Sequence, residues 1–375
     1  MCSIVTSRVA LLRFTEPTRP RGARKTSGRL QSVDCKRLDP FMGRSFGEHN
    51  GRVEEDCVNG AFMSKPLRVG IIGLGARCSI AENCQVSSVP AELVGGCDPN
   101  SAMRERAREI LGDHPWVESL EELLDLGIDA AIVTSPDDTH EDITCQLLEA
   151  GVAVYLEKPI AITIEGADRV LETAFRTKTP LYVGHNMRHM AVVRILRQVI
   201  RDGLIGEVRA IWCRHFVGNG GDYYFKDWHA DRSRTTGLLL QKAAHDIDVM
   251  NWLSDSVPER IVGMGDLMVY GKLTDRSGQR RDSVMSDWFS FDNWPPESLT
   301  GLNPVIDVED LSMFMMRQVS GTMISYEQCH FTPDYWRNYT VIGTRGRAEN
   351  FGDGDGGVVR VWKHRSRWEP QGDIE

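Results

Sequence analysis

Two glycines and one acid, placed around two short apolar runs, are the first residues of the chain that could do chemistry. The run Val69–Ile72 leads directly into Gly73 and Gly75, and a second apolar run further along ends in Asp98. Gly73 permits a tight turn after a buried strand, and Gly75 lets the backbone approach a pyrophosphate at the start of a helix. Asp98, at the tip of the next strand, is placed to accept ribose hydroxyls. The spacing therefore predicts a dinucleotide site, with Cys78 at the position of the third glycine.

Three further segments with polar side chains follow apolar runs of the kind that form buried strands. They are residues 134–140, 157–159 and 185–189. Because ligands of a doubly wound parallel sheet bind beyond the carboxyl ends of its strands, we expect these segments to meet at the dinucleotide site. Lys158 is followed by a proline, which holds the lysine rigidly in this crevice. A lone lysine is more commonly a solvated surface residue, but the neighbouring polar strand ends favour a functional role for Lys158.

The elements that position these residues alternate between strand and helix from Leu67 onward. The capping residues expected at two helix starts are Asp137, Asp138 and Thr163. Alternation of strand and helix with short connections is typical of a doubly wound parallel sheet. Residues 67–187 are therefore predicted to form an α/β domain of the Rossmann type. Its predicted strands are 67–72, 92–97, 129–134, 152–156 and 181–184, and its predicted helices are 101–111, 138–150 and 163–177.

The pattern changes after about residue 190, where longer apolar–polar alternations predict antiparallel strands with one exposed face. A hairpin is expected at Arg317–Gly321, and one helix, Gln241–Leu253, interrupts the strands. Residues 188–375 are therefore predicted to form an α+β domain with a largely antiparallel open sheet. Its other predicted elements are a helix at 190–202 and strands within 208–216, 282–291, 308–318, 321–331 and 338–344.

The first 66 residues differ from the rest of the chain. They show mixed charge and no periodicity, so that we expect a disordered or spurious N-terminal extension at 1–66. Met63 is the natural start that this interpretation favours. An organelle transit peptide is less favoured, because no convincing amphipathic helix is present.

Five short motifs together resemble the glucose–fructose oxidoreductase and inositol dehydrogenase family, Gfo/Idh/MocA. In chain order the motifs are GLGAR, CDP, SPDDTH, EKP and GHNMRH, and the similarity extends over about residues 67–350, including GTRGRAENFG. This resemblance implies a Rossmann domain, a second domain built on an open antiparallel sheet, and NAD(P)-linked oxidation of sugars or polyols. It also implies a homo-oligomer that assembles through the outer face of that sheet.

The family's second signature is a histidine on a helix of the C-terminal domain, and it matches His245. The helix places Gln241, Lys242 and Asp248 within about one turn of this histidine. Many relatives have an acid where this chain has Gln241, and Lys242 resembles the lysine of a subgroup. The resemblance therefore leaves Lys158 and His245 as the pair common to the family.

Hydride removal from a carbinol carbon requires a base for the hydroxyl proton and a donor that steadies the alkoxide. We expect Lys158 to hydrogen-bond the reacting oxygen and His245, which titrates near neutral pH when free, to accept the proton. The residues expected to bind substrate are Asn186, Arg188, Trp228, His229, Gln241, Lys242 and Asp248. The residues expected to bind the cofactor are Gly73, Leu74, Gly75, Ala76, Arg77, Asp98, Ser135, Pro136, His140, Glu157 and Lys158.

The identity of the cofactor depends on the acid at the second strand tip. Asp98 followed by Pro99 favours NAD, because a carboxylate repels the 2′-phosphate of NADP. Arg77 could offset part of this repulsion, so that NADP stays possible.

The composition excludes several classes of function. The chain has 375 residues and a formal net charge of −9, and its acidic excess lies after residue 66, which argues against a nucleic-acid partner. No apolar run is long enough to span a bilayer, so that we expect no membrane association. The nine cysteines include no CxxC pair and no zinc pattern, which indicates a reducing, cytoplasmic compartment and no metal site.

Two other functions stay open from the sequence. One is an NAD-dependent glycosidase of the same fold, although the EKP motif looks like that of the redox members. The other is a non-catalytic dinucleotide-binding sensor or degenerate member, since relatives usually continue beyond the point where this chain ends. We therefore expect a truncated C-terminus. The particular sugar or polyol is not specified by the sequence.

Overall fold

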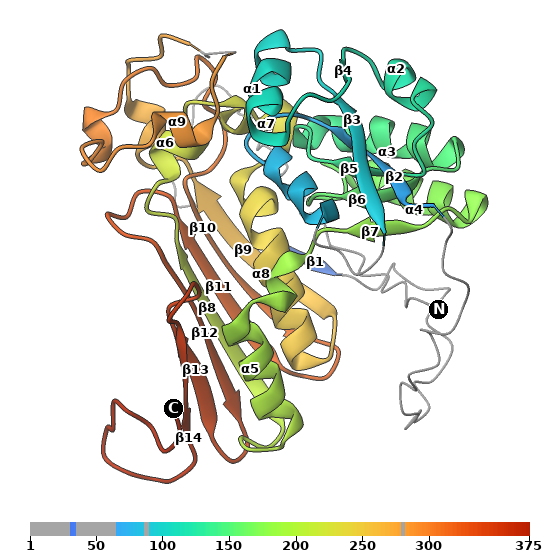
Figure 1. The fold of residues 1–375 in the computed structure, drawn as a ribbon. Coiled ribbons are helices and arrows are strands. Elements are labelled where there is room, and N and C mark those ends of the chain that lie inside the picture. The colour runs from blue at the N-terminus through green and yellow to red at the C-terminus, as the bar shows by residue number, and fades with distance from the viewer. Residues whose placement is uncertain (1–30, 35–64, 86–89, 279–281) are drawn as a thin grey trace.

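The computed structural model describes residues 31–34, 65–85, 90–278 and 282–375, which form an α/β domain and a larger sheet domain (Figure 1). Most of the expected N-terminal extension, residues 1–66, lies outside the described residues. Within it, β1 (Gln31–Asp34) pairs antiparallel with β9 (Pro258–Asp266). No helix in the described ranges is both long enough and apolar enough to cross a membrane.

The first domain contains a six-stranded sheet in the order β4-β3-β2-β5-β6-β7, in which every neighbouring pair is parallel. The strands are β2 (Leu67–Ile72), β3 (Ala91–Cys97), β4 (Trp116–Val117), β5 (Ala130–Val133), β6 (Ala153–Leu156) and β7 (Leu181–Val183). All five predicted strands are confirmed. The two-residue edge strand β4 was not predicted, because it is too short to show a period.

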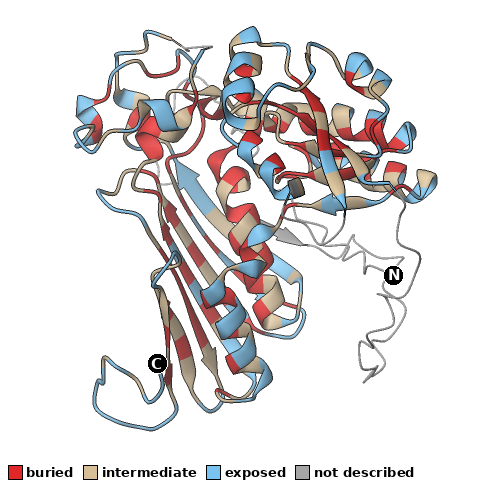
Figure 2. Ribbon diagram, viewed as in Figure 1, coloured by how far each residue is buried: buried red, intermediate tan, exposed pale blue. Residues whose placement is uncertain are grey.

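Helices lie on both faces of this sheet, and their buried sides point toward it (Figures 1 and 2). They are α1 (Ser101–Leu111), α2 (Leu120–Asp125), α3 (His140–Glu149) and α4 (Ile164–Thr177). The predicted cap of α4 is confirmed, since Thr163 Oγ1 accepts the backbone N–H of Gly166 at 2.9 Å.

The predicted cap of α3 is wrong. Asp137 and Asp138 form a 3-10 turn ahead of this helix, and neither carboxylate caps it. Asp137 instead accepts a hydrogen bond from Thr235 Oγ1 at 3.1 Å, and Asp138 lies 3.3 Å from the guanidinium of Arg234. Both partners belong to α7 (Arg232–Thr235) of the second domain, so that the two acids connect the domains.

The second domain is built on an eight-stranded sheet in the order β1-β9-β10-β11-β8-β12-β13-β14. Its remaining strands are β8 (Val208–Phe216), β10 (Leu311–Gln318), β11 (Met323–Cys329), β12 (Trp336–Gly343), β13 (Arg347–Phe351) and β14 (Val358–Trp362). Neighbouring strands are antiparallel except for β11 and β8. The predicted antiparallel open sheet and its β10–β11 hairpin are confirmed.

One predicted strand of this domain is wrong. Residues 282–291 contain the short helix α9 (Met285–Trp288) with turns on both sides. The side chain of Asp287 accepts the backbone N–H of Val284 at 2.9 Å, and this local contact closes a turn that an extended strand cannot make.

Two long helices cover one face of the second sheet, α5 (Ala191–Arg201) and α8 (Leu238–Ser254) (Figure 1). Both were predicted, and α8 begins three residues earlier than expected. Apolar side chains from these helices and from the sheet form one continuous core, which includes Leu196, Val249, Ile211 and Tyr339. The packing of α8 against the sheet determines which of its side chains face the first domain.

Candidate active site

The glycine turn after β2 has the backbone that a dinucleotide site requires. Gly73 has a φ of +86°, and a Cβ there would lie 2.4 Å from the backbone nitrogen of Ser135, so that no side chain fits. A Cβ at Gly75 would meet no atom within 4 Å, which leaves open space beside the turn. The chain continues as the 3-10 helix η3 (Cys78–Gln85) rather than the expected α-helix. The open side of the turn at Gly75 is the place where the sequence predicts the pyrophosphate.

Asp98 is held at the carboxyl end of β3 by two backbone donors. One carboxylate oxygen accepts the N–H of Leu74 and the other that of Asn100, both at 2.9 Å. Each oxygen keeps a further lone pair, which is what two ribose hydroxyls need. The structure therefore brings the predicted acid directly against the predicted glycine turn.

The loops after β5 and β6 are joined by His140. Its Nδ1 lies 2.6 Å from the carbonyl oxygen of Pro159, and its Nε2 lies 2.9 Å from that of Ser135. Beside them, the buried carboxylate of Glu157 pairs with the guanidinium of Arg77 at 3.1 Å. These contacts bring the predicted cofactor-binding residues to one edge of the sheet. Of the others, Leu74 and Ala76 lie in the turn after β2, and Pro136 lies in the loop after β5.

Lys158 reaches from the first domain to the second. It follows β6, and its Nζ donates a hydrogen bond to the carbonyl oxygen of Gln241 on α8 at 2.8 Å. Burial lowers the pKa of Lys158 to about 8, although the carboxylate of Asp137 opposes the shift. The amine is therefore protonated at neutral pH and close to its titration point.

His245 lies one helical turn beyond Gln241 on α8. Its ring packs edge-on against that of His185, which follows β7, with 6.2 Å between ring centroids. Burial lowers the pKa of His245 well below its ordinary value, and the charge of Lys158 lowers it further. Its Nδ1 is buried and has no hydrogen-bond partner among the residues that the structure describes. A neutral imidazole with an unused ring nitrogen therefore lies in the electrostatic field of Lys158.

Lys242, the second lysine of the site, lies over an aromatic ring. Its Nζ is 4.3 Å from the ring centroid of Tyr224, which ends α6 (Gly220–Tyr224). Burial lowers the pKa of Lys242 to about 7, and the positive charge of Arg337 contributes to the shift. Sequence reasoning missed Tyr224, because nothing in its own segment marks it.

The Trp228–His229 loop lies against the same tyrosine. The rings of Trp228 and His229 stack with 3.6 Å between centroids, and His229 meets Tyr224 edge-on at 5.1 Å. Burial lowers the pKa of His229 well below its ordinary value, and its Nδ1 lacks a hydrogen-bond partner in the described part of the chain. His229 is thus a second neutral imidazole in the neighbourhood of Lys158 and Lys242.

Two residues predicted to bind substrate pair with each other instead. Arg188 donates from Nε and Nη2 to the two carboxylate oxygens of Asp248, at 2.6 and 2.5 Å. The pair joins the turn η5 (Asn186–His189) to α8. Each charge is therefore already compensated, and Asn186, which was also predicted to bind substrate, is exposed at the start of that turn.

A buried polar network that the sequence did not indicate fixes α8 to the sheet. Asp246 accepts hydrogen bonds from Tyr339 at 2.5 Å, Tyr326 at 3.0 Å and His215 at 3.1 Å, and its carboxylate lies 3.2 Å from Arg337 Nε. Burial alone would raise the pKa of Asp246, but Arg337 and His215 outweigh it and hold this pKa well below its usual range. Asp246 follows His245, so that the network fixes the orientation of the candidate base.

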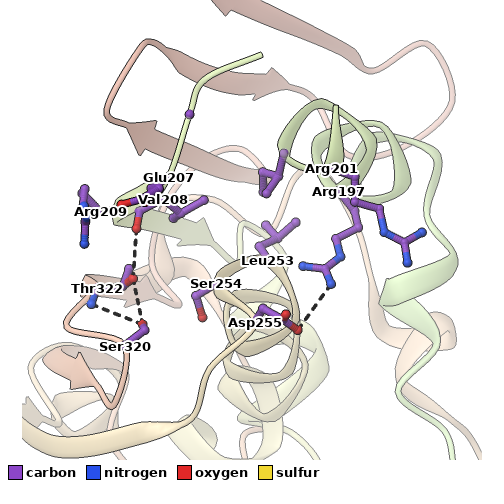
Figure 3. A pocket seen from close by; sticks show the side chains of 12 residues that line it. Arg197, Arg201, Glu207, Val208, Arg209, Leu253, Ser254, Asp255, Ser320 and Thr322 are labelled. Carbon is purple, nitrogen blue, oxygen red and sulfur yellow. Dashed lines mark hydrogen bonds and ion pairs between the residues drawn. The ribbon is translucent and has the colours of Figure 1, made fainter. Parts of the chain in front are cut away.

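A cavity of about 620 Å³ lies away from these residues, near the C-terminal ends of α5 and α8 (Figure 3). Several of its charged side chains are paired with one another: Arg197 lies 3.4 Å from Asp255, and Arg209 pairs with Glu207. None of the predicted site residues lines it. The candidate active site is therefore the cluster around Lys158 and His245.

Comparisons with known families match both halves of the chain. Residues 67–185 match the family model described as an oxidoreductase family with an NAD-binding Rossmann fold. Residues 193–349 match the Gfo/Idh/MocA C-terminal domain. The two matches meet between β7 and α5, close to the predicted domain boundary.

Individual relatives are similar over part of their length. The chain is 27% identical to the protein YteT of Bacillus subtilis, over 59% of this chain and 60% of the relative. It is 30% identical to inositol 2-dehydrogenase of Azotobacter vinelandii, over 50% of this chain and 54% of the relative. The chain thus spans little more than half the length of these curated relatives.

Solved structures share the fold. The WlbA dehydrogenase of Bordetella pertussis, crystallised with NADH and UDP-GlcNAcA, superposes with a TM-score of 0.64 at 20% identity. The superposition covers 80% of this chain and 76% of that one. At this identity the likeness establishes the two-domain fold and leaves the chemistry to be argued from the residues.

Proposed function

Because the chain belongs to the Gfo/Idh/MocA oxidoreductase family, we propose that it is an NAD(P)-dependent dehydrogenase acting on a CH–OH group of a sugar or polyol. The observation that carries the proposal is the 2.8 Å hydrogen bond from Lys158 Nζ to the carbonyl oxygen of Gln241. This contact brings a lysine of the nucleotide-binding domain onto the helix that contains His245. A donor and a base, the two groups that hydride removal requires, thus come from different domains and meet at one place.

The cofactor would occupy the edge of the first sheet. The turn at Gly73 and Gly75 would hold the pyrophosphate, and Asp98 would hold the ribose, with Arg77 and Glu157 beside them. A nicotinamide cofactor bound there supplies hydride transfer chemistry. We expect NAD to be preferred, because the two backbone N–H donors to Asp98 fix its negative charge where a 2′-phosphate would lie.

The two catalytic groups have separate roles. The Lys158 ammonium donates to the reacting oxygen and stabilises the negative charge that develops on it during oxidation. His245 accepts the hydroxyl proton and returns it in the reverse direction. Burial and the charge of Lys158 lower the pKa of His245, so that its imidazole is in the unprotonated form that a base requires.

The remaining buried polar atoms suit a ligand with many hydroxyl groups. Among the described residues, Nδ1 of His185, His229 and His245 and Oε1 of Gln241 are buried and have no hydrogen-bond partner. Buried polar atoms left unpaired cost free energy, and a sugar or polyol would supply both donors and acceptors to them. This arrangement supports the substrate class without selecting one sugar.

The proposal is tested by incubating the purified protein with NAD and a panel of polyols and aldoses, with NADH absorbance as the readout. We expect at least one member to reduce NAD, and Lys158→Met to slow this reduction by about 10²- to 10⁴-fold. Release of a chromogenic aglycone without net NADH would point to a glycosidase. Thermal stabilisation by NADH without turnover of any member would point to a cofactor-binding sensor, and either result would overturn the proposal.

We further propose that the protein acts in a reducing compartment such as the cytoplasm. In the described residues six cysteines are free, and Cys78, Cys97 and Cys213 are buried within apolar core clusters. Thiols in such positions act as small hydrophobic side chains, and their packing requires no disulfide bond.

A further inference from the structure

The cations around the candidate site differ in whether a carboxylate neutralises them. Arg77, Arg188, Arg234 and Arg337 each lie within 3.3 Å of a carboxylate oxygen, on Glu157, Asp248, Asp138 and Asp246 respectively. Within the described part of the chain, no carboxylate lies within ion-pair distance of Lys242. It likewise has no hydrogen bond there. Lys158 also has no carboxylate partner among the described residues, but its Nζ donates to the carbonyl oxygen of Gln241. Lys242 is therefore the cation of this cluster for which the described residues supply neither an ion pair nor a hydrogen bond.

The ammonium of Lys242 is in contact with an aromatic ring. Its ammonium lies over the ring of Tyr224, which is packed edge-on against His229 at 5.1 Å and His330 at 5.5 Å. Burial lowers the pKa of both imidazoles well below the ordinary value, so that neither is charged at neutral pH. His330 Nδ1 is fully buried and finds no partner among the described residues. The subsite thus contains one cation and two neutral imidazoles. The carboxylate of Asp227 lies 3.8 Å from Nδ1 of one of these imidazoles, His229.

Keeping an ammonium in such a place is costly. Burial lowers the pKa of Lys242 to about 7, because water that would solvate the cation is excluded. The positive charge of Arg337 lowers this pKa further. Asp246 and Asp137 oppose the shift, but Asp246 is already engaged by Arg337 and Asp137 by Thr235. A bound anion would restore the missing partner and hold Lys242 in its protonated form.

Resting on the proposed function, we propose that the substrate carries an anionic group, a carboxylate or a phosphate, which pairs with Lys242 while its reacting hydroxyl lies at Lys158 and His245. The two lysines then have different tasks: Lys158 serves the reacting oxygen, and Lys242 selects the substrate by its charge. The ring of Tyr224 supports the ammonium from one side, and the neutral imidazoles contact hydroxyl groups between the two ends.

The test uses three sugars that differ only at C6: D-glucose, D-glucuronate and D-glucose 6-phosphate. With NAD and the full chain, we expect kcat/KM for one of the two anions to exceed that for glucose by about tenfold or more. Lys242→Met should remove this preference through KM, so that the ratio of kcat/KM for the anion to kcat/KM for glucose falls by about 10- to 100-fold. Lys242→Arg should keep most of the preference, since it keeps the charge. Lys363→Met, which removes an exposed lysine, is the matched control.

A binding measurement separates this inference from the proposed function. Isothermal titration of the same three sugars into NADH-saturated protein reports on the charge preference even if none of them is oxidised. Binding of an anionic sugar that depends on Lys242 supports the inference whether or not NAD is reduced. Oxidation of neutral polyols without preference for either anion would overturn the inference and leave the dehydrogenase intact. Lack of Lys242-dependent binding of both anions, in the absence of turnover, would also overturn it.

Discussion

Burial gives the two lysines of the site an acidity that neither has in water. It lowers the pKa of Lys158 to about 8 and that of Lys242 to about 7, while the same loss of solvent keeps His245 and His229 uncharged. The two lysines, which stay protonated at neutral pH in water, therefore become groups that can hold or release a proton there. Their different neighbours, a backbone carbonyl for Lys158 and an aromatic ring for Lys242, then separate their tasks.

The pH dependence of the reaction follows from these values. We predict that kcat/KM for oxidation falls as the pH rises through about 8, because the protonated Lys158 donor is lost above its lowered pKa. His245 is already unprotonated at neutral pH, so that its protonation reduces the rate only well below its ordinary pKa. Asp137, Lys242, Tyr224 and Glu157 also act on the amine, and Asp137 is the strongest of them.

A rate profile between pH 6 and 9.5 measures this prediction, and the residual rate of Lys158→Met should lack the alkaline fall. A rate that instead increases through pH 8 would mean that the neutral amine of Lys158 is the base, and the assigned roles would be wrong.

Catalysis and cofactor binding should be separable by single substitutions. Lys158→Met should reduce turnover by about 10²- to 10⁴-fold and leave NADH affinity unchanged, because the glycine turn and Asp98 are untouched. Gly73→Ala should abolish NADH binding, since its Cβ would lie 2.4 Å from the backbone nitrogen of Ser135. Fluorescence titration with NADH and steady-state rates check both. Loss of NADH affinity in Lys158→Met would argue against a role at the reacting oxygen.

Preference between the two cofactors should depend on the charge of Asp98. Asp98→Asn keeps an oxygen that can accept the Leu74 N–H but removes the repulsion of a 2′-phosphate. We predict that the ratio of NAD to NADP affinity falls roughly tenfold. Asp113→Asn, on an exposed acid of the same domain, is the control. Tighter binding of NADP than NAD by the unaltered protein would contradict the prediction.

Single residues were predictable from sequence where a local motif marks them. Lys158 and His245 each lie in such a motif, and the structure connects them through the carbonyl of Gln241. Asp137 was interpreted as a helix cap from its position before a helix. Its actual partner, Thr235, lies too far away in the sequence for a local pattern to reveal it. Tyr224 was missed for the same reason, since its role depends on packing between segments that no short pattern records.

At the scale of elements, α8 is the helix on which the site depends. One side carries His245 and Lys242, and Asp246 connects the helix to the sheet through Tyr339, Tyr326 and Arg337. Sequence periodicity identified this helix and the sheet strands β8, β10, β11 and β12, because each shows its period within a few residues. It misassigned 282–291, where the side chain of one acid closes a turn.

Loss of the contacts that Asp246 makes between α8 and the sheet should destabilise the protein. Asp246→Asn leaves the buried guanidinium of Arg337 with one fewer counter-charge, and we predict a loss of about 3–5 kcal/mol in the free energy of unfolding. Asp246 has a lowered pKa in the folded protein, so that its contribution is present above the pKa of an unfolded aspartate and is lost as the pH falls toward the folded value.

Urea unfolding at pH 7 measures the effect of this substitution. The double variant Asp246→Asn/Arg337→Met should recover part of the loss, because it removes the uncompensated charge as well. A single variant within about 1 kcal/mol of the parent would show that the network does not anchor α8.

For the whole molecule, the candidate site lies where the two domains meet. Lys158 contributes from the first domain and His245 from the second, and Asp137 with Thr235 and Asp138 with Arg234 form further connections. The alternating pattern predicted each domain by itself, since strand and helix periods are local. These three contacts between the domains join residues that are 83, 98 and 96 positions apart, and only the folded chain brings them together.

The face of the second sheet opposite α5 and α8 leads to a prediction about assembly. Met315 on β10 and Trp212 on β8 are 59% and 53% exposed, and the strand register places both in one row through Ser325. Met264 on β9, Met313 on β10 and Met323 on β11 are also exposed. An apolar patch of this kind on a sheet typically marks an interface. We propose that a second copy of the chain covers it.

Two charges placed in this patch should prevent that association. We predict that Met315→Lys/Trp212→Lys is a monomer at concentrations where the parent chain is an oligomer, because each ammonium would have to lose its hydration in an apolar interface. Sedimentation velocity measures both proteins, with Phe175→Lys as the control, since Phe175 is an apolar residue on α4 of the other domain that is even more exposed, at 87%. The double variant should keep its NADH affinity, because the glycine turn lies in the first domain. A parent chain that is monomeric at tens of micromolar, or a double variant that still associates, would show that this face is not the interface.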